Sequence, residues 1–183
     1  MKKLTLTSIL LGVFALSGFA QVNVRKQDQQ DRIGNGVQSG KLTAGETRNL
    51  EDREAALNGE TRADHRKDGG GPLTAAQKAR INTQQNGLSS RIYQDKHNAN
   101  TAKFGNNEVG QRRENQQDRI AQGIRSGNLK AGQTAQLEGR EANLNRQVSA
   151  DRSVNGGRLT NGERAQVNKR QNNLSRSIYR DKR

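Results

Sequence analysis

The stretch that decides the fold is 159–183, LTNGERAQVNKRQNNLSRSIYRDKR, and it has a twin in 73–97, LTAAQKARINTQQNGLSSRIYQDKH. Twelve of the 25 positions are identical at an offset of 86 residues, so the chain contains a duplicated unit. Thr160 followed by Glu163 forms a capping box, which starts a helix. Behind it the apolar residues are spaced by seven and four, as on one helix face: Val167, Leu174 and Ile178. The stretch predicts an amphipathic helix in each half of the chain.

The duplication extends through the rest of the sequence. Segment 27–64 matches 114–151 at 21 of 38 positions with an offset of 87 residues. The two offsets differ by one because the glycine-rich loop 68–72 is one residue longer than its counterpart 155–158. A length change confined to a loop indicates that the segments on either side are structured.

Each copy reads as three helices, and those of the first copy are expected at about 28–38, 43–66 and 73–97. The fold class is therefore all-α: two tandem copies of a three-helix unit with thin cores, joined by a polar linker. The expected boundaries are copy 1 at 21–98, the linker at 99–113 and copy 2 at 114–183. In the second copy Lys130 replaces the capping threonine, Thr43. This helix start should be weaker, by about 1 kcal/mol.

The first twenty residues, MKKLTLTSILLGVFALSGFA, have the features of a secretory signal peptide. Two lysines precede a short apolar run, and cleavage is expected after Ala20. We therefore expect a periplasmic or secreted protein. No later segment is apolar enough to cross a membrane.

The composition favours binding over catalysis. The chain has no cysteine, so no thiol site can form, and it has only two histidines. A zinc ion bridging His65, His97 and Asp64 is conceivable, but solvated surface histidines are the stronger expectation. The acids Glu51 and Glu54 lie near arginines along one helix, which is typical of a solvated, salt-bridged face. We therefore expect no enzymatic activity and no cofactor.

Charge is the feature with functional content. The chain has a net charge of +14, and segment 114–183, with 14 basic and 7 acidic residues, carries more of it than 21–98 does. On the last helix Lys169, Arg176, Arg180 and Arg183 repeat the apolar spacing two residues later, roughly 200° around the helix. This pattern predicts a basic stripe opposite the buried face. Arginine suits phosphate and carboxylate because its planar fork donates two parallel hydrogen bonds.

These features predict a binding or scaffolding protein that associates electrostatically with an anionic envelope surface or extracellular polymer. Nucleic acid is a weaker expectation for the partner. After the signal segment the aromatic residues are only Tyr93, Phe104 and Tyr179, too few to stack against single strands.

One loop is similar to the framework of an EF-hand, in which twelve residues join two helices and bind calcium. Segment 35–46 has the length, with Gly40 at the turn and Glu46 at the closing position. The resemblance implies Asn35, Ser39 and Glu46 as cation ligands, although Val37 occupies a position that should supply an oxygen. A divalent-cation (calcium) module built on degenerate loops is the alternative function.

The chain also resembles a group of uncharacterised exported bacterial proteins. In these proteins L-T-x-x-E helix starts alternate with an I-Y-x-D-K-H ending, which stands here at 92–97 and, with a final arginine, at 178–183. The resemblance covers both copies and implies a helical repeat architecture. It implies no activity.

Overall fold

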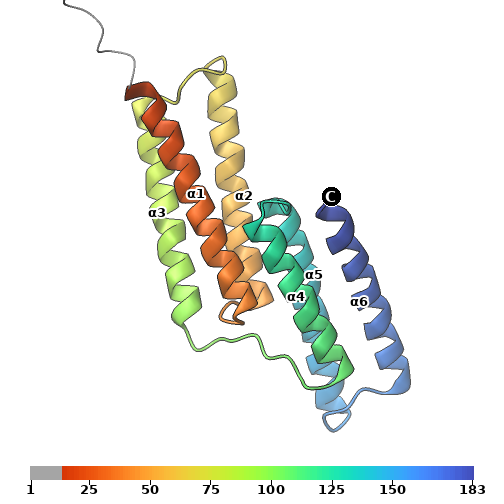
Figure 1. Cartoon of the computed structure of the whole chain (residues 1–183). Coiled ribbons are helices and arrows are strands. Elements are labelled where there is room, and N and C mark those ends of the chain that lie inside the picture. Colours follow the sequence, from red (N-terminus) through yellow and green to blue (C-terminus); the bar gives the residue numbers. More distant parts are fainter. Residues whose placement is uncertain (1–13) are drawn as a thin grey trace, which may run out of the picture.

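The computed structural model describes residues 14–183, which form six α-helices and no strand (Figure 1). The helices are α1 (Phe14–Gln38), α2 (Ala44–Lys67), α3 (Ala75–His97), α4 (Glu108–Arg125), α5 (Ala131–Val154) and α6 (Asn161–Asp181). The all-α prediction is confirmed for this part of the chain. Residues 1–13, which include most of the predicted signal segment, lie outside the described residues. None of the described helices has the length and apolar character needed to cross a membrane.

Two helix starts differ from the sequence prediction. The predicted start of the first helix at about residue 28 is wrong, because α1 already covers the polar segment that precedes it. Val22, in that segment, is buried in a cluster with Leu57, Leu73 and Ile81. The predicted linker 99–113 also ends too late, because α4 begins inside it at Glu108. Val109, which is only 7% exposed, packs in a buried cluster at the start of α4, much as Val22 does in α1.

Polar caps set most of the other helix starts. Thr43, Thr74 and Thr160 each accept a hydrogen bond from the backbone N–H three residues later, and the side chain at that later position accepts one in return. These are the predicted capping boxes, and each occupies two N–H groups that a helix start leaves unpaired. Lys130, at the start of α5, provides no such side-chain bond, and only the reciprocal bond from its own N–H to Gln133 Oε1 is present, at 3.0 Å.

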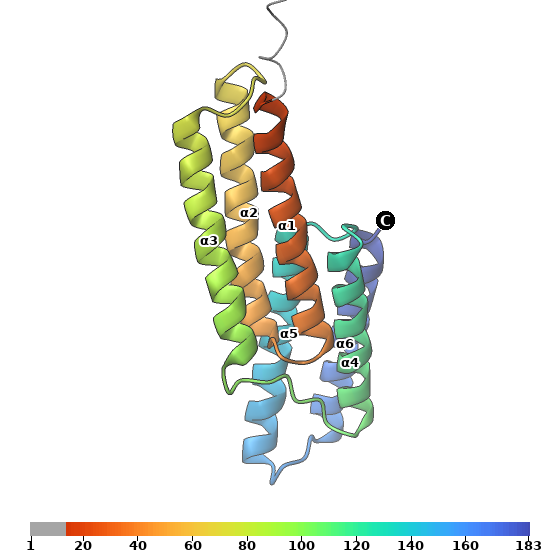
Figure 2. The same cartoon turned by 60° about the vertical axis from the view of Figure 1, so that its left-hand side comes forward.

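The helices pack side by side as one elongated bundle (Figures 1 and 2). Helix α3 packs against both α1 and α2, and α6 packs against both α4 and α5. The most extensive contacts join the two halves of the chain, because α2 lies along α5 and α1 lies along α4. The two ends of the molecule are therefore formed by α1–α3 and α4–α6, and the middle by both.

The hydrophobic core follows this arrangement. Its largest cluster takes residues from all six helices, including Ile33, Leu50 and Ile92 from the first half and Ile120, Leu137 and Ile178 from the second. Smaller clusters lie at each end, and one of them contains Val109, Leu144, Val148 and Val167. The sequence suggested two separate thin cores, but the largest cluster is shared between the halves.

Candidate anion-binding surface

The predicted basic stripe lies on the solvent side of α6. Lys169, Arg176 and Arg180 are exposed along the helix, and Arg183 is exposed just beyond its last residue, Asp181. The apolar face of the same helix is buried, as its spacing predicts: Val167, Leu174 and Ile178 are 0–3% exposed. The stripe therefore faces away from the core.

Local contacts hold parts of this stripe without removing its charge from the surface. Arg176 Nη2 donates to Asn173 Oδ1 at 2.6 Å, and the Arg183 guanidinium lies 4.3 Å from the centre of the Tyr179 ring. Arg180 Nε lies 3.0 Å from Asp181 Oδ1, in an ion pair whose arginine side chain is 72% exposed. An ion pair that is so exposed is screened by water, so the guanidinium remains available to a partner.

The corresponding face of α3 is an internal reference for the stripe. At the offset of 86 residues, Thr83, Ser90, Gln94 and His97 take the places of the four basic residues. All four are exposed on α3, as their counterparts are on or next to α6. The same helix face thus carries four cations in the second half and uncharged side chains, apart from a titratable histidine, in the first half.

The burial of several acids leaves the surface of the molecule with less negative charge. Among residues 21–183, whose side chains are described, every buried ionisable residue is an acid: Glu51, Glu54, Asp64, Asp95, Glu138 and Glu141. The prediction that Glu51 and Glu54 lie on a solvated face is wrong, since they are 0% and 1% exposed. Only their neighbours Arg48 and Asp52 form the expected exposed ion pair, at 3.5 Å.

Glu51 on α2 and Glu138 on α5 are buried where these two helices pack together. Gln30 Nε2, on α1, donates to Glu51 Oε2 at 3.3 Å, and Gln117 Nε2, on α4, donates to Glu138 Oε2 at 3.1 Å. The other carboxyl oxygen, Oε1, of each glutamate is buried without a hydrogen-bond partner in the described structure. An unpaired buried oxygen favours the protonated acid, because a buried charge without partners is costly.

The pKa values of Glu51 and Glu138 are shifted upward, in the direction that favours the protonated acid. Burial raises the pKa of Glu51 to about 8, although the hydrogen bond from Gln30 acts in the opposite direction. Burial also raises the pKa of Glu138 well above its ordinary value, and the nearby Glu51 carboxyl adds to the effect. At neutral pH the interior thus contributes less negative charge than the sequence implies.

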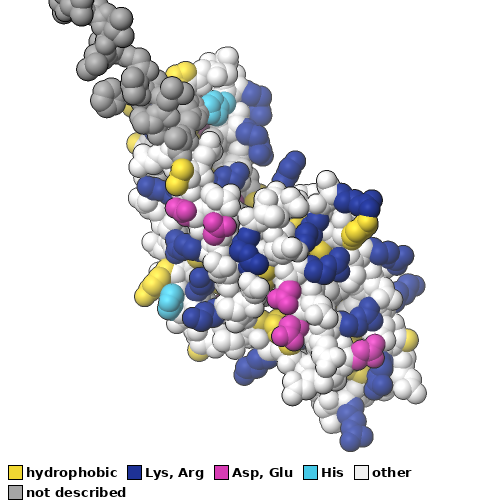
Figure 3. Space-filling view, viewed as in Figure 1, with side chains coloured by type: hydrophobic (Ala, Val, Ile, Leu, Met, Phe, Trp, Pro, Cys, Tyr) yellow, Lys and Arg dark blue, Asp and Glu magenta, His cyan; other side chains and the backbone are white. Residues whose placement is uncertain are grey.

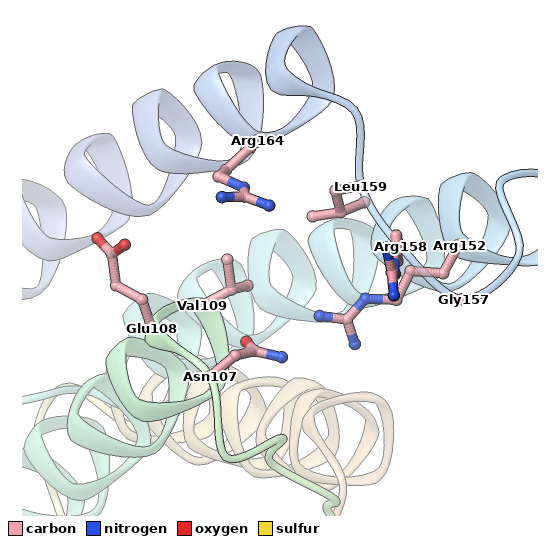
Figure 4. Close-up of a pocket in the computed structure, with 8 residues that line it drawn as sticks. All are labelled: Asn107, Glu108, Val109, Arg152, Gly157, Arg158, Leu159 and Arg164. Atoms are coloured by element: carbon pink, nitrogen blue, oxygen red, sulfur yellow. The ribbon is translucent and has the colours of Figure 1, made fainter.

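Lysine and arginine side chains are spread over both ends of this face in the space-filling view, including α4–α6, where some acids lie between them (Figure 3). A pocket of about 290 Å³ also lies at the far end of this half (Figure 4). We call it the arginine pocket. It is lined by Asn107, Glu108, Val109, Arg152, Gly157, Arg158, Leu159 and Arg164.

Three separate segments supply the arginines of this pocket. Arg152 comes from the last turn of α5, Arg158 from the loop that follows, and Arg164 from the first turn of α6. Within residues 14–183 none of these three side chains forms an ion pair or hydrogen bond. Figure 4 shows Arg152 and Arg164 reaching toward the pocket from different helices. The charge pattern along the sequence did not reveal this pocket, because its arginines follow no helical period.

The residues of the calcium alternative have other roles in the structure. Asn35 lies within α1, and its carbonyl oxygen accepts hydrogen bonds from both the N–H and the hydroxyl of Ser39. The Glu46 carboxylate accepts hydrogen bonds from the backbone and hydroxyl of Thr43 and from the amide of Asn98. Nowhere in 14–183 are three or more His, Cys, Asp or Glu side chains placed together to hold a metal ion.

No protein-family model matches the chain, and no curated protein or solved structure does so either.

Proposed function

We propose that this protein is a non-catalytic binding or scaffolding protein, which associates electrostatically with an anionic envelope or extracellular polymer. The observation that carries the proposal is the separation of charge: the buried ionisable residues are acids, while the α6 stripe is exposed. A surface of one sign attracts a polymer of the other sign and raises the rate of their association.

The second half is the proposed binding half. Two of its acids, Glu138 and Glu141, are buried, and Glu163 is occupied in the capping box of α6. The exposed face of α6 has uncharged or weakly basic counterparts on α3. The cations of the second half thus meet a partner with little competition from neighbouring carboxylates.

The proposal includes the architecture and the location suggested by the sequence. The six helices are proposed to be two copies of one three-helix unit, fused through a common core. Equivalent buried contacts support this: Gln29 Nε2 donates to Gln85 O, and Gln116 Nε2 donates to Gln171 O, both at 2.7 Å. Export to the periplasm or cell exterior, and membership of the group of exported repeat proteins, are further parts of the proposal.

The test measures binding to heparin and to lipopolysaccharide as a function of salt concentration. Affinity should fall steeply with salt, because binding releases counterions from the polymer. In the variant K169T/R176S/R180Q/R183H, each cation becomes the residue found at the equivalent position of α3. The slope of log affinity against log salt should then decrease by roughly one for each cation that contacts the polymer.

The matched control removes four charges from the first half by changing Lys41, Arg53, Arg66 and Lys67 to glutamine. All four residues are exposed, so the net charge falls equally without disturbing the core. Polymer affinity should fall much less than in the α6 variant. Equal losses in the two variants would show that net charge alone governs binding, and no binding by the native chain at low salt would reject the proposal.

A further inference from the structure

We infer that the arginine pocket is a binding site for one tetrahedral oxyanion group, a phosphate or sulfate ester carried by the polymer. This inference rests on the proposed function, because it names the chemical group that the second half recognises. It concerns different residues from the α6 stripe, so the two can be tested separately.

Positive charge is concentrated in the arginine pocket. Arg152, Arg158 and Arg164 line one cavity, and Glu108 is the only acid among its lining residues. In Figure 4 the Glu108 side chain extends away from Arg152 and Arg158. Three like charges around one space repel each other, and a bound anion would relieve that repulsion.

The equivalent end of the first half holds an arginine in ion pairs. There Arg80 forms ion pairs with Glu60 and, at 2.5 Å, with Asp64. In the second half, glutamines replace Arg80 and Glu60, and the Nε2 of Gln147 donates to Gln166 Oε1 at 3.0 Å. Of the two acids that neutralise Arg80, Glu60 thus has no acidic equivalent in the second half, and Asp64 is retained as Asp151, which forms no ion pair in the described structure.

The replacements that create the pocket are also specific to the second half. Arg152 stands at the place of His65 and Arg158 at the place of Pro72. His65 Nδ1 lies 3.0 Å from Gly71 O, so this side chain is directed to its own loop. The places of Arg152 and Arg158 are thus taken in the first half by a histidine directed to its own loop and by a proline.

The side chains of the arginine pocket suit a tetrahedral oxyanion. Guanidinium forks donate paired hydrogen bonds to the oxygens of phosphate and sulfate, and three forks from three segments match a tetrahedral group better than a planar carboxylate. Val109 and Leu159 provide an apolar part of the wall. A volume of about 290 Å³ accommodates the oxyanion and part of the sugar or other group that carries it.

The experiment is a titration of the full chain, followed by NMR of backbone amides and arginine side-chain Nε–H groups. Sodium phosphate, sodium sulfate and sodium acetate are added at constant ionic strength, with chloride as the balance. We expect saturable shifts at 107–109 and 157–159 with phosphate and sulfate, and at least tenfold weaker binding of acetate. Preference between phosphate and sulfate identifies which ester the site takes.

Two variants make the test specific. R152Q/R158Q/R164Q should reduce phosphate and sulfate affinity at least tenfold, whereas K169T/R176S/R180Q/R183H should leave the phosphate shifts unchanged. Far-ultraviolet circular dichroism checks that both variants keep their helices. The inference is overturned if the native chain shows no saturable shifts, if acetate binds equally well, or if the pocket variant retains the phosphate response.

The outcome is separable from that of the proposed function. If phosphate or sulfate binds in the pocket but heparin and lipopolysaccharide are not retained, the site stands and polymer binding is rejected. If the polymers bind with full dependence on the α6 stripe and the pocket gives no anion response, the pocket inference alone is rejected.

Discussion

Arg113 Nε, on α4, lies 2.9 Å from Glu141 Oε1, on α5, and the two side chains are only 13% and 1% exposed. This is the most buried ion pair in the described part of the chain. Burial raises the pKa of Glu141, and the neighbouring Arg113 guanidinium acts in the opposite direction. The pair thus joins two helices through a carboxylate that has almost no access to water.

Changing Arg113 to methionine should lower the free energy of unfolding by about 3 kcal/mol at pH 8, because the change leaves a buried carboxylate without its cation. The loss should be smaller at pH 5, where Glu141 accepts a proton more easily. Urea unfolding followed by circular dichroism measures both values. Arg53→Met, at an exposed position, is the control and should cost less than about 0.5 kcal/mol. Equal losses at pH 5 and pH 8 would contradict this role of the ion pair.

The raised pKa of Glu51 predicts how the free energy of unfolding depends on pH. Its pKa rises from an ordinary 4.5 to about 8 in the folded chain, so the folded state holds the proton more tightly than the unfolded state does. Its contribution is fully present below pH 4.5. The free energy of unfolding should then fall by roughly 1 kcal/mol per pH unit until about pH 8.

The variant Glu51→Gln keeps a side chain of the same shape without a titrating proton, so this slope should be reduced. The variant should therefore be more stable than the native chain at pH 9, as measured by urea unfolding at pH 5, 7 and 9. The groups that act on Glu51 are Gln30, Glu54, Lys26 and Asp52. Asp28→Asn, at an exposed site outside this group, is the control and should preserve the native slope. Parallel curves for Glu51→Gln and the native chain would refute the assignment.

Lys130→Thr should stabilise the protein by about 1 kcal/mol, because the new hydroxyl can accept a hydrogen bond at the uncapped start of α5. Thr43 provides such a bond at the start of α2, where its Oγ1 accepts from Glu46 N at 3.3 Å. Thermal and urea unfolding measure the gain. Lys130→Ala removes the same charge without supplying a cap, so an equal gain from alanine would assign the effect to charge.

Gly36 and Gly123 should not tolerate alanine. A Cβ atom at either position would lie 2.6 Å from a leucine methyl, Leu42 Cδ1 in the first case and Leu129 Cδ1 in the second. Each substitution should lower the free energy of unfolding by about 1–3 kcal/mol, the usual cost of overpacking. Gly59→Ala is the control, because nothing lies within 4 Å of the added atom and alanine favours the helix. Stabilisation at Gly36 or Gly123 would show that the leucines move aside at little cost.

The helix faces could be predicted from the sequence, because a few apolar residues with regular spacing define which side is buried. Val167, Leu174 and Ile178 are examples, and the exposure of Lys169 on the opposite side follows from the same period. The capping threonines likewise identify helix starts through local hydrogen bonds, which need no tertiary information.

The buried acids illustrate what a single helix pattern leaves undetermined. Glu54 lies between Leu50 and Leu57 at helical spacing, a signal for burial, but its charge favours the opposite interpretation. Glu54 is buried because α5 packs over α2. A local sequence period does not encode such a contact between distant segments. The repetition of the pattern at Glu141, between Leu137 and Leu144, was the available clue.

The arginine pocket was beyond sequence reasoning for a related reason. Arg152, Arg158 and Arg164 belong to a helix end, a loop and the next helix start, and their meeting depends on the geometry of that loop. The one-residue difference between the loops of the two halves, together with Arg158 in place of Pro72, marked the region as different.

The most direct test of the central claim, that position of charge governs binding, exchanges the outer faces of α3 and α6. The exchanged chain carries T83K/S90R/Q94R/H97R together with K169T/R176S/R180Q/R183H, so its composition and its net charge match the native chain. The measurement is the salt concentration that elutes each protein from immobilised heparin. Charge separation in the second half predicts earlier elution of the exchanged chain, because its four cations are then separated from Arg152, Arg158 and Arg164 of the second half. Elution of both proteins at the same salt concentration would contradict the claim.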